Sequence, residues 1–457
     1  KKFADYQLES SSLSSMNVGL STDLTSIDIV NNLDGFANLN CVYSFDLVRE
    51  NSLNFDSKIV STEVIFANRI LQDYSQSSGN RVLSIDDLSG QFNSHPRPTA
   101  YSVVDSFTLS EMRARKYFIL VQDQKYYAQR QLIVVDLLHD DVNSYLNQYG
   151  RVSTEYDQGS FDFKVDGSFG QLLFYPTRYT INDYWITAIS YNLDDNLLGT
   201  GSTSIGGLTL IDTESASVSA GTTTTIVSIA STYSSAKILV EVNPDISMND
   251  NEFEFVELNI AHNGTDVAMT EYIKLTTNLG LRPASGYGTY YPYLESSLLK
   301  VDFIPNTGIG TTAAVNTVTV GLANSTYSGI GTYQFYHTRL EAKATSISAS
   351  GSPTQNVISG YGDGYEGAYF LVQVCDKTNN EYQLSEFAVL DNYNVDDASG
   401  DTYDIEWGNV ETLSGIGTLG SRPTVSGGVE LVFTPKASID VEVNVFMNGL
   451  TYVEEPQ

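Results

Sequence analysis

The sequence predicts an all-β protein built from tandem antiparallel β-sandwiches, and three observations carry this prediction. The 457 residues include 30 Tyr, 20 Phe and 35 Gly, with many Thr, Val, Ser and Asn. These residue types favour pleated strands and the turns between them. One pattern of apolar segments recurs three times along the chain. Alternation of apolar and polar residues with period two is clear at 253–260 and 441–446, as expected for strands with one buried face.

The repeat is marked most clearly by a proline that ends an apolar run. The prolines are Pro176, Pro305 and Pro435, so the spacings are 305 − 176 = 129 and 435 − 305 = 130 residues. Proline has no backbone N–H, which suits the end of a strand. Each proline is followed by one apolar strand and preceded by two. These flanking strands are expected at 117–121, 131–138 and 185–190, at 237–242, 253–260 and 317–322, and at 369–374, 382–390 and 441–446.

The elements taken in order predict an assembly arm followed by three sandwiches. The arm spans 1–75, is extended, and contains one candidate short helix at 63–71, for which a strand is the alternative. Three sandwiches of the jelly-roll or immunoglobulin-like type are expected at 76–200, 201–325 and 326–457. Tandem sandwiches of this kind predict a stiff rod or arm.

Charge excludes one broad class of function. Lys and Arg total 24 and Asp and Glu total 55, giving a net charge of −31. A polyanion of this size is repelled by nucleic-acid phosphates, so we expect no nucleic-acid partner. No apolar run reaches the roughly 20 residues that a membrane-spanning helix needs, so membrane insertion is not expected. Cys41 and Cys375 are far apart and are expected to be buried thiols.

No catalytic motif is present, so the sequence predicts a protein without enzymatic activity and without catalytic residues. Serine never occurs in a GxSxG context. His139 and His262 occupy equivalent positions in the first two repeats, where the third has Asp391 or Asn392. A histidine that recurs once per repeat indicates a structural role.

No cofactor or metal site is predicted, although one acidic stretch was weighed as a calcium site. The run 391–404 is rich in Asp, Asn and Gly, the residues of calcium-binding loops. It lacks the EF-hand spacing and the closing Glu, so a solvated loop is the favoured interpretation. The stretch 245–254 is a weaker case of the same kind.

Two groups of residues are candidates for recognition. Tyrosine offers a large rigid contact area with a polar tip. The Tyr-dense stretch in the second repeat is therefore a candidate subunit interface, with ordinary loop packing and glycan stacking as alternatives; its residues are Tyr287, Tyr290, Tyr291 and Tyr293. The second group is basic and is expected either to dock an acidic neighbouring subunit or to form a solvated strand face. Its residues are Arg113, Arg115, Lys116, Lys125 and Arg130.

Three stretches resemble one protein family. The run 66–87 (FANRILQDYSQSSGNRVLSIDD), together with 156–161 (YDQGSF) and 193–199 (LDDNLLG), is similar to segments of large virion structural proteins of contractile-tailed marine cyanophages. The resemblance covers roughly 40–210. It implies a non-enzymatic component of a phage tail, baseplate or fibre, located in the virion.

The leading hypothesis is therefore a virion structural subunit whose partners are other virion structural proteins. A homo-oligomer, plausibly a trimer, is expected, with the arm docked on neighbouring subunits. The alternative is an adhesin that binds a host receptor or surface glycan through its Tyr-rich loops. A polysaccharide-degrading enzyme is disfavoured, because the period of about 130 residues is far too long for the coils of a β-helix.

Overall fold

The computed structural model describes residues 101–450, apart from several short stretches between strands, together with short strands at 16–20, 27–31, 72–75 and 81–84. The predicted all-β class is confirmed. The described part of the chain contains 29 strands and no α-helix, and a 3-10 turn, η1 (Leu109–Glu111), follows the strand at 102–108.

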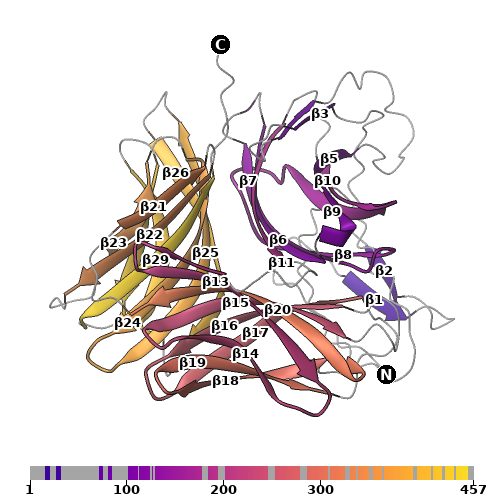
Figure 1. Cartoon of the computed structure of the whole chain (residues 1–457). Helices are drawn as coiled ribbons and strands as arrows, with labels where there is room; N and C mark the ends of the chain where they lie inside the picture. Colours follow the sequence, from indigo (N-terminus) through magenta and orange to yellow (C-terminus); the bar gives the residue numbers. More distant parts are fainter. Residues whose placement is uncertain are drawn as a thin grey trace.

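The strands form three units, and each unit pairs a six-stranded sheet with a three-stranded sheet (Figure 1). The strand order is the same in all three. In unit 1 the large sheet has the order β3-β4-β11-β6-β7-β8 and the small sheet β5-β10-β9. In units 2 and 3 the orders are β12-β13-β20-β15-β16-β17 with β14-β19-β18, and β21-β22-β29-β24-β25-β26 with β23-β28-β27.

The strand bounds are as follows. Unit 1 contains β3 (Gln72–Ser75), β4 (Arg81–Ser84), β5 (Ser102–Thr108), β6 (Ala114–Asp123), β7 (Arg130–His139), β8 (Ser144–Ser153), β9 (Gly159–Asp166), β10 (Phe169–Pro176) and β11 (Tyr184–Leu193). Unit 2 contains β12 (Gly201–Ile205), β13 (Thr209–Ser219), β14 (Thr224–Ala230), β15 (Tyr233–Pro244), β16 (Glu254–His262), β17 (Val267–Thr276), β18 (Gly288–Glu295), β19 (Leu298–Pro305) and β20 (Thr312–Ala323). Unit 3 contains β21 (Ile330–Phe335), β22 (Thr338–Ile347), β23 (Asn356–Tyr361), β24 (Gly367–Asp376), β25 (Glu381–Asn394), β26 (Ser399–Glu411), β27 (Gly417–Pro423), β28 (Val429–Pro435) and β29 (Val441–Leu450).

Part of the predicted arm is strand. β1 (Met16–Leu20) and β2 (Ile27–Asn31) form an antiparallel hairpin. β3 lies just before the boundary expected at residue 76, yet it pairs with β4 in the large sheet of unit 1. The helix predicted at 63–71 lies outside the described residues. The boundaries of the arm and of the three sandwiches stay predictions.

Each unit has its own apolar core between its two sheets. In unit 1 this core includes Ile119, Ile133, Phe163 and Phe174. Equivalent clusters fill the other two units. Successive side chains of a strand point to opposite faces of the sheet. All ten residues of β6 are buried, so both faces of the sheet are covered at this strand. The outer face of each large sheet is therefore covered as well.

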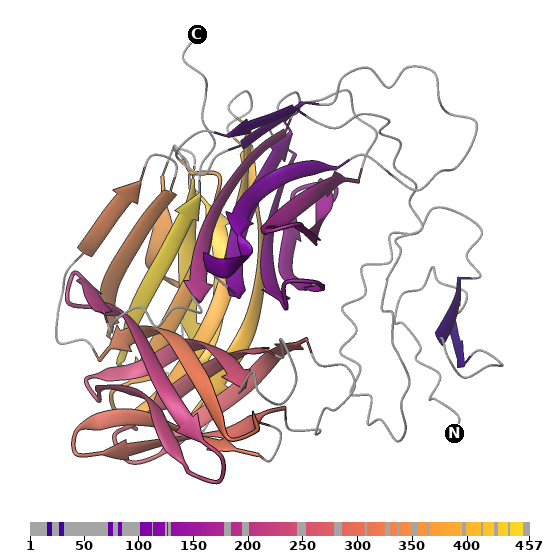
Figure 2. The ribbon, with the colours of Figure 1, turned by 45° about the vertical axis from the view of Figure 1, so that its right-hand side comes forward.

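That cover is supplied by the other two units. Three further apolar clusters lie between units 1 and 2, between units 2 and 3, and between units 1 and 3. Figures 1 and 2 show the three large sheets gathered around a common centre, with the small sheets facing outward. The rod expected from tandem sandwiches is wrong, because a linear row of three would leave its first and last members apart.

The marker prolines are found at the predicted strand ends and reveal a packing rule. Each lies opposite a glycine of the neighbouring strand: Pro176 opposite Gly159, Pro305 opposite Gly288 and Pro435 opposite Gly417. A Cβ atom on any of these glycines would overlap a core phenylalanine ring. The overlapped rings are Phe174, Phe303 and Phe433.

This rule predicts that Gly417→Ala destabilises the protein. The Phe433 ring is fully buried and cannot move away, so we expect a loss of about 1–3 kcal/mol in the free energy of unfolding, measured by chemical denaturation. Gly420→Ala in the same strand is the control, because its Cβ would lie 3.8 Å from the nearest atom, Val432 Cγ2. Equal stability of the two variants would contradict the rule.

Candidate functional site

The centre where the three units meet is built from equivalent positions of the repeat. Cross-strand register defines the equivalence, because the first two core strands of each unit pair in the same way. The innermost equivalent pairs are Lys116–Asp136, Lys237–Asn259 and Tyr369–Ala388. The pairs two residues further along the strands are Phe118–Val134, Leu239–Glu257 and Leu371–Glu386.

A third strand adds an aromatic residue to the centre from each unit. The ladders β7–β8, β16–β17 and β25–β26 all shift register at this point, which places one aromatic residue beside each bulge. A bulge re-aims the side chains around it. The three aromatic residues are Tyr149, Tyr272 and Trp407.

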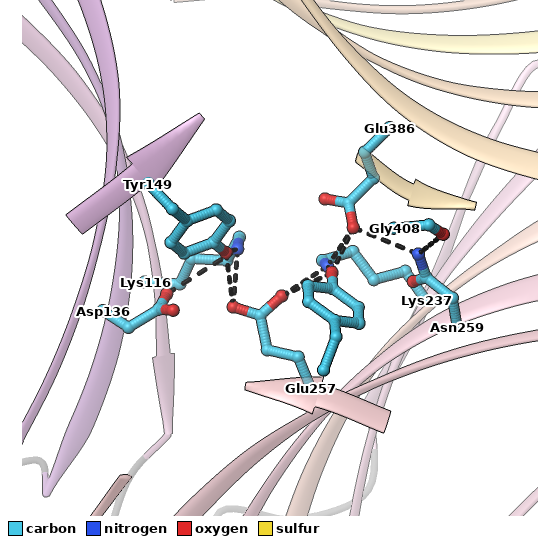
Figure 3. Close-up of polar contacts among 9 residues, drawn as sticks. Lys116, Asp136, Tyr149, Lys237, Glu257, Asn259, Glu386 and Gly408 are labelled. Carbon is cyan, nitrogen blue, oxygen red and sulfur yellow. Dashed lines mark hydrogen bonds and ion pairs between the residues drawn. The ribbon is translucent and has the colours of Figure 1, made fainter. Parts of the chain in front are cut away.

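We call the polar part of this centre the hub (Figure 3). It consists of Lys116, Asp136, Tyr149, Lys237, Glu257, Asn259, Tyr272 and Glu386.

The first half of the hub joins unit 1 to unit 2. Lys116 Nζ lies 2.6 Å from Glu257 Oε1 and also contacts the hydroxyl of Tyr149. That hydroxyl donates to Glu257 Oε1 at 2.7 Å. Asp136 Oδ1 lies 3.6 Å from Lys116 Nζ. The side chains of Lys116, Asp136 and Glu257 are fully buried, so water screens none of these charges.

The second half joins unit 2 to unit 3. Lys237 contacts Glu257 within its own unit and lies 2.8 Å from Glu386 Oε1 of unit 3. The Tyr272 hydroxyl lies against both carboxylates and donates to Glu257 Oε2 at 2.8 Å. Asn259 Nδ2 donates to Glu386 Oε1 at 3.1 Å and to the backbone oxygen of Gly408 at 2.6 Å.

Electrostatics in the hub follow from burial and pairing. Burial by itself would raise the pKa of Glu257, but Lys116 and Lys237 outweigh it and hold that pKa well below its usual range. Burial would lower the pKa of Lys237, but Glu257 and Glu386 hold it above its ordinary value. Burial raises the pKa of Asp136, and the negative charge of Glu257 adds to this effect. The hub therefore brings two lysines and two glutamates into close pairs, and burial shifts Asp136 toward its neutral form.

Each ionic contact between units in the hub joins a lysine of one unit to a glutamate of the next unit along the chain. The Lys of unit 1 meets the Glu of unit 2, and the Lys of unit 2 meets the Glu of unit 3. At the third junction, between units 3 and 1, Tyr369 occupies the lysine position and Val134 occupies the glutamate position. This junction therefore has no ion pair of this kind. The Tyr369 ring lies 4.7 Å from the Phe118 ring and 6.2 Å from the Trp407 ring.

Three of the five residues of the predicted basic patch are not at the surface, and a fourth, Arg113, is partly buried and pairs with Asp141. Arg115, Lys116 and Arg130 are buried, and Lys125 lies outside the described residues. Arg130 pairs with Glu366 of unit 3 and donates to the backbone oxygen of Asp391 at 2.6 Å. The solvated strand face is therefore wrong for these three residues. Glu257, which pairs with Lys116, and Glu366, which pairs with Arg130, lie in other units of the same chain.

Tyr290, Tyr291 and Tyr293 lie in a strand, β18, so their predicted placement in a loop is wrong, whereas Tyr287 lies in the turn just before it. Tyr287 and Tyr290 are buried in the core of unit 2. Tyr291 is 59% exposed, and its ring stacks 6.1 Å from that of Tyr293 on the outer face of the small sheet. The structure thus leaves only the latter two in a position for recognition.

The recurring histidines are placed as predicted. His139 and His262 are buried at the ends of β7 and β16, and each accepts a hydrogen bond at Nδ1 from the backbone N–H two residues later. Asp391 is the equivalent residue of unit 3, because its backbone N–H bonds Glu366 as that of His139 bonds Arg113. Their role is to close strand ends.

Both cysteines were expected to be buried thiols, and the structure describes one of them. Cys375 is a buried free thiol as predicted, while Cys41 lies outside the described residues.

The acidic run 391–404 forms the β25–β26 hairpin, and its tip at 395–398 lies outside the described residues. Among described residues, no group of three or more potential metal ligands occurs.

A small cavity of about 20 Å³ adjoins the hub. It is lined by hub residues, including Lys116, Lys237 and Glu386, and by apolar side chains such as Leu239 and Phe446. This volume holds about one water molecule, so it is too small for a substrate or an organic cofactor.

Comparison of the chain with family models, with curated proteins and with solved structures found no match. Within the described residues, no helix is long and apolar enough to cross a membrane.

The hub predicts that Lys237→Met is strongly destabilising. Removing this ammonium group leaves Glu386 buried without its cation, which costs about 3–5 kcal/mol in the free energy of unfolding. The measurement is chemical denaturation followed by circular dichroism. Adding Glu386→Met should restore much of the loss, because the unpaired charge is then removed as well.

Lys164→Met is the matched control, since Lys164 pairs with Asp166 on the exposed surface. It should leave stability unchanged. A loss for Lys237→Met no larger than for this control would show that the hub charges do not hold the units together.

Proposed function

We propose that this chain is a non-enzymatic structural subunit of a bacteriophage virion, in the tail, baseplate or fibre. The observation that carries the proposal is the hub. Its ionisable groups are buried and directed at one another across unit boundaries, which makes it a mechanical joint and leaves no group free to meet a substrate. The resemblance of 40–210 to cyanophage virion proteins supports the same role.

The threefold arrangement adds to this proposal. One chain presents three similar sandwiches around one centre, with three small sheets on the outside. Such a block offers repeated surfaces to neighbouring virion proteins, and the segment 1–75 would serve as the docking arm. A homotrimer is not needed to cover the faces of the large sheets, because the chain covers them itself. Association into a homo-oligomer would use other surfaces.

The test is to locate the chain in purified phage particles. Particles are banded on a density gradient, and peptides from 101–450 are quantified by mass spectrometry against other structural proteins. We expect a constant ratio across the particle band, retained in separated tails. Presence in the host lysate with none in the particles would overturn the proposal.

A second candidate is glycan binding, and one observation favours it. Tyr291 and Tyr293 form a stacked, outward-facing pair beside Asp302, which accepts a hydrogen bond from the Tyr293 hydroxyl at 3.2 Å. Adjacent aromatic rings with polar neighbours suit a sugar, whose apolar face stacks and whose hydroxyls hydrogen-bond.

This candidate predicts that the double variant Tyr291→Ala and Tyr293→Ala loses glycan-array binding. Both rings lie on the outer face, so the fold should be retained. Tyr156→Ala removes an exposed tyrosine of unit 1 and is the control. Absence of binding by the unaltered chain to a broad array of host-envelope glycans would eliminate the candidate.

A further inference from the structure

Three groups of the hub have the arrangement that an amide bond requires. Lys116 supplies an amine, Asp136 a carboxyl group, and Glu257 a base in contact with the amine at 2.6 Å. Lys116 and Asp136 lie directly opposite each other on the antiparallel strands β6 and β7. Lys116 Nζ is 3.6 Å from Asp136 Oδ1, and both side chains are 0% exposed. This distance places the amine beside the carboxyl group whose carbon, Cγ, it would attack.

Asp136 has the character of an electrophile. It is completely buried, and the ionisable side chains closest to it are Lys116 and Glu257. Burial raises its pKa, and the nearby charge of Glu257 raises it further, so the neutral acid is favoured. An amine attacks a neutral carboxylic acid far more readily than a carboxylate, because the carboxylate carbon is shielded by negative charge.

Glu257 has the character of a proton carrier. It contacts the amine that must lose a proton, and Lys116 and Lys237 keep it deprotonated while also making it a weaker base. The Tyr149 hydroxyl donates to the same carboxylate oxygen at 2.7 Å and fixes its position. A base in this position can accept the proton of the ammonium group and return it to the leaving oxygen.

We propose that Lys116 and Asp136 become joined by an isopeptide bond between Nζ and Cγ, with Glu257 as the proton carrier.

The reaction balances without an external reagent. Glu257 takes one proton from the Lys116 ammonium group, and the resulting amine attacks Asp136 Cγ to form a tetrahedral intermediate. A second proton of the nitrogen passes through Glu257 to the departing hydroxyl, which leaves as water. The C–N bond forms, the C–O bond breaks, and Glu257 keeps one proton. The net charge of the site is zero before and after.

The position of Glu257 couples the bond to folding. Lys116 and Asp136 belong to unit 1, whereas Glu257 belongs to unit 2. The three groups therefore meet only when the units have assembled around the centre. The bond would then fasten β6 to β7 within the hub, where exclusion of water also protects it from hydrolysis.

The equivalent pairs of the other units should not react. Tyr369 and Ala388 have neither functional group. Lys237 and Asn259 have an amine and an amide, but Asn259 Nδ2 is already committed to Gly408 and Glu386 as a donor. Expulsion of that nitrogen as ammonia would first require it to accept a proton. The proposal is therefore specific to unit 1.

The test is the intact mass of the purified full chain. We expect a mass about 18 Da below that of the sequence, the mass of one water molecule. Proteolysis followed by tandem mass spectrometry should yield one branched peptide that joins the segments around Lys116 and Asp136. A folded chain with the full sequence mass would overturn the proposal and leave only a noncovalent pair.

Two variants separate the isopeptide bond from other losses of water. Lys116→Met should restore the full mass expected for that variant. Cyclisation of Asp136 with its own backbone would also lose water, but it would persist in Lys116→Met, and this result would overturn the proposal. Asp136→Asn should change the loss to about 17 Da if a bond still forms, because ammonia then leaves in place of water.

Glu257→Gln tests the proton carrier. It should abolish the branched peptide while near-ultraviolet circular dichroism shows whether the fold is retained. If Glu257→Gln does not fold, the mass of the unaltered chain still decides the proposal. A branched peptide at the native level in folded Glu257→Gln would exclude Glu257 from the reaction.

Discussion

Charges buried at the centre of this protein are paired across the boundaries between units as well as within them. Lys116 depends on Glu257, and Lys237 depends on Glu386, so neither ammonium group is fully matched within its own sandwich. A buried ion that loses its partner is costly. The same faces of the large sheets also bury apolar clusters between units. The three sandwiches are thereby joined into one body.

The junctions differ in chemistry, and this difference orders the units. Two of them combine an ammonium group with a carboxylate, while the third packs Tyr369 near Phe118 and Trp407. Exchanging units would place Lys opposite Val or Tyr opposite Glu, leaving a buried charge without a partner. Polar and apolar junctions therefore discriminate between correct and incorrect arrangements, as polar positions do in other assemblies. A covalent bond between Lys116 and Asp136 would lie within unit 1, and it would form only where Glu257 of unit 2 has reached the centre.

Much of the fold could be predicted from sequence because it depends on local signals. The spacing of Pro176, Pro305 and Pro435 revealed the repeat, and apolar runs located the central strands. The hub was missed because its members are scattered from 116 to 386, and a lysine in a strand suggests a solvated face. One signal was available: runs such as 117–121 are apolar without alternation, which indicates strands buried on both faces. Tyr290 was predicted to be a recognition residue but is buried in the core of unit 2. Composition alone does not show which face of a strand packs against the core.

The central claim is that the three units unfold together because the hub and its surrounding clusters join them. Differential scanning calorimetry tests this directly by comparing the measured heat of unfolding with the van't Hoff heat from the shape of the transition. A ratio of about 1 means that the units melt as one cooperative body, and this is the result the account predicts. A ratio near about 3, or three resolved transitions, would mean that each sandwich unfolds alone and would contradict it.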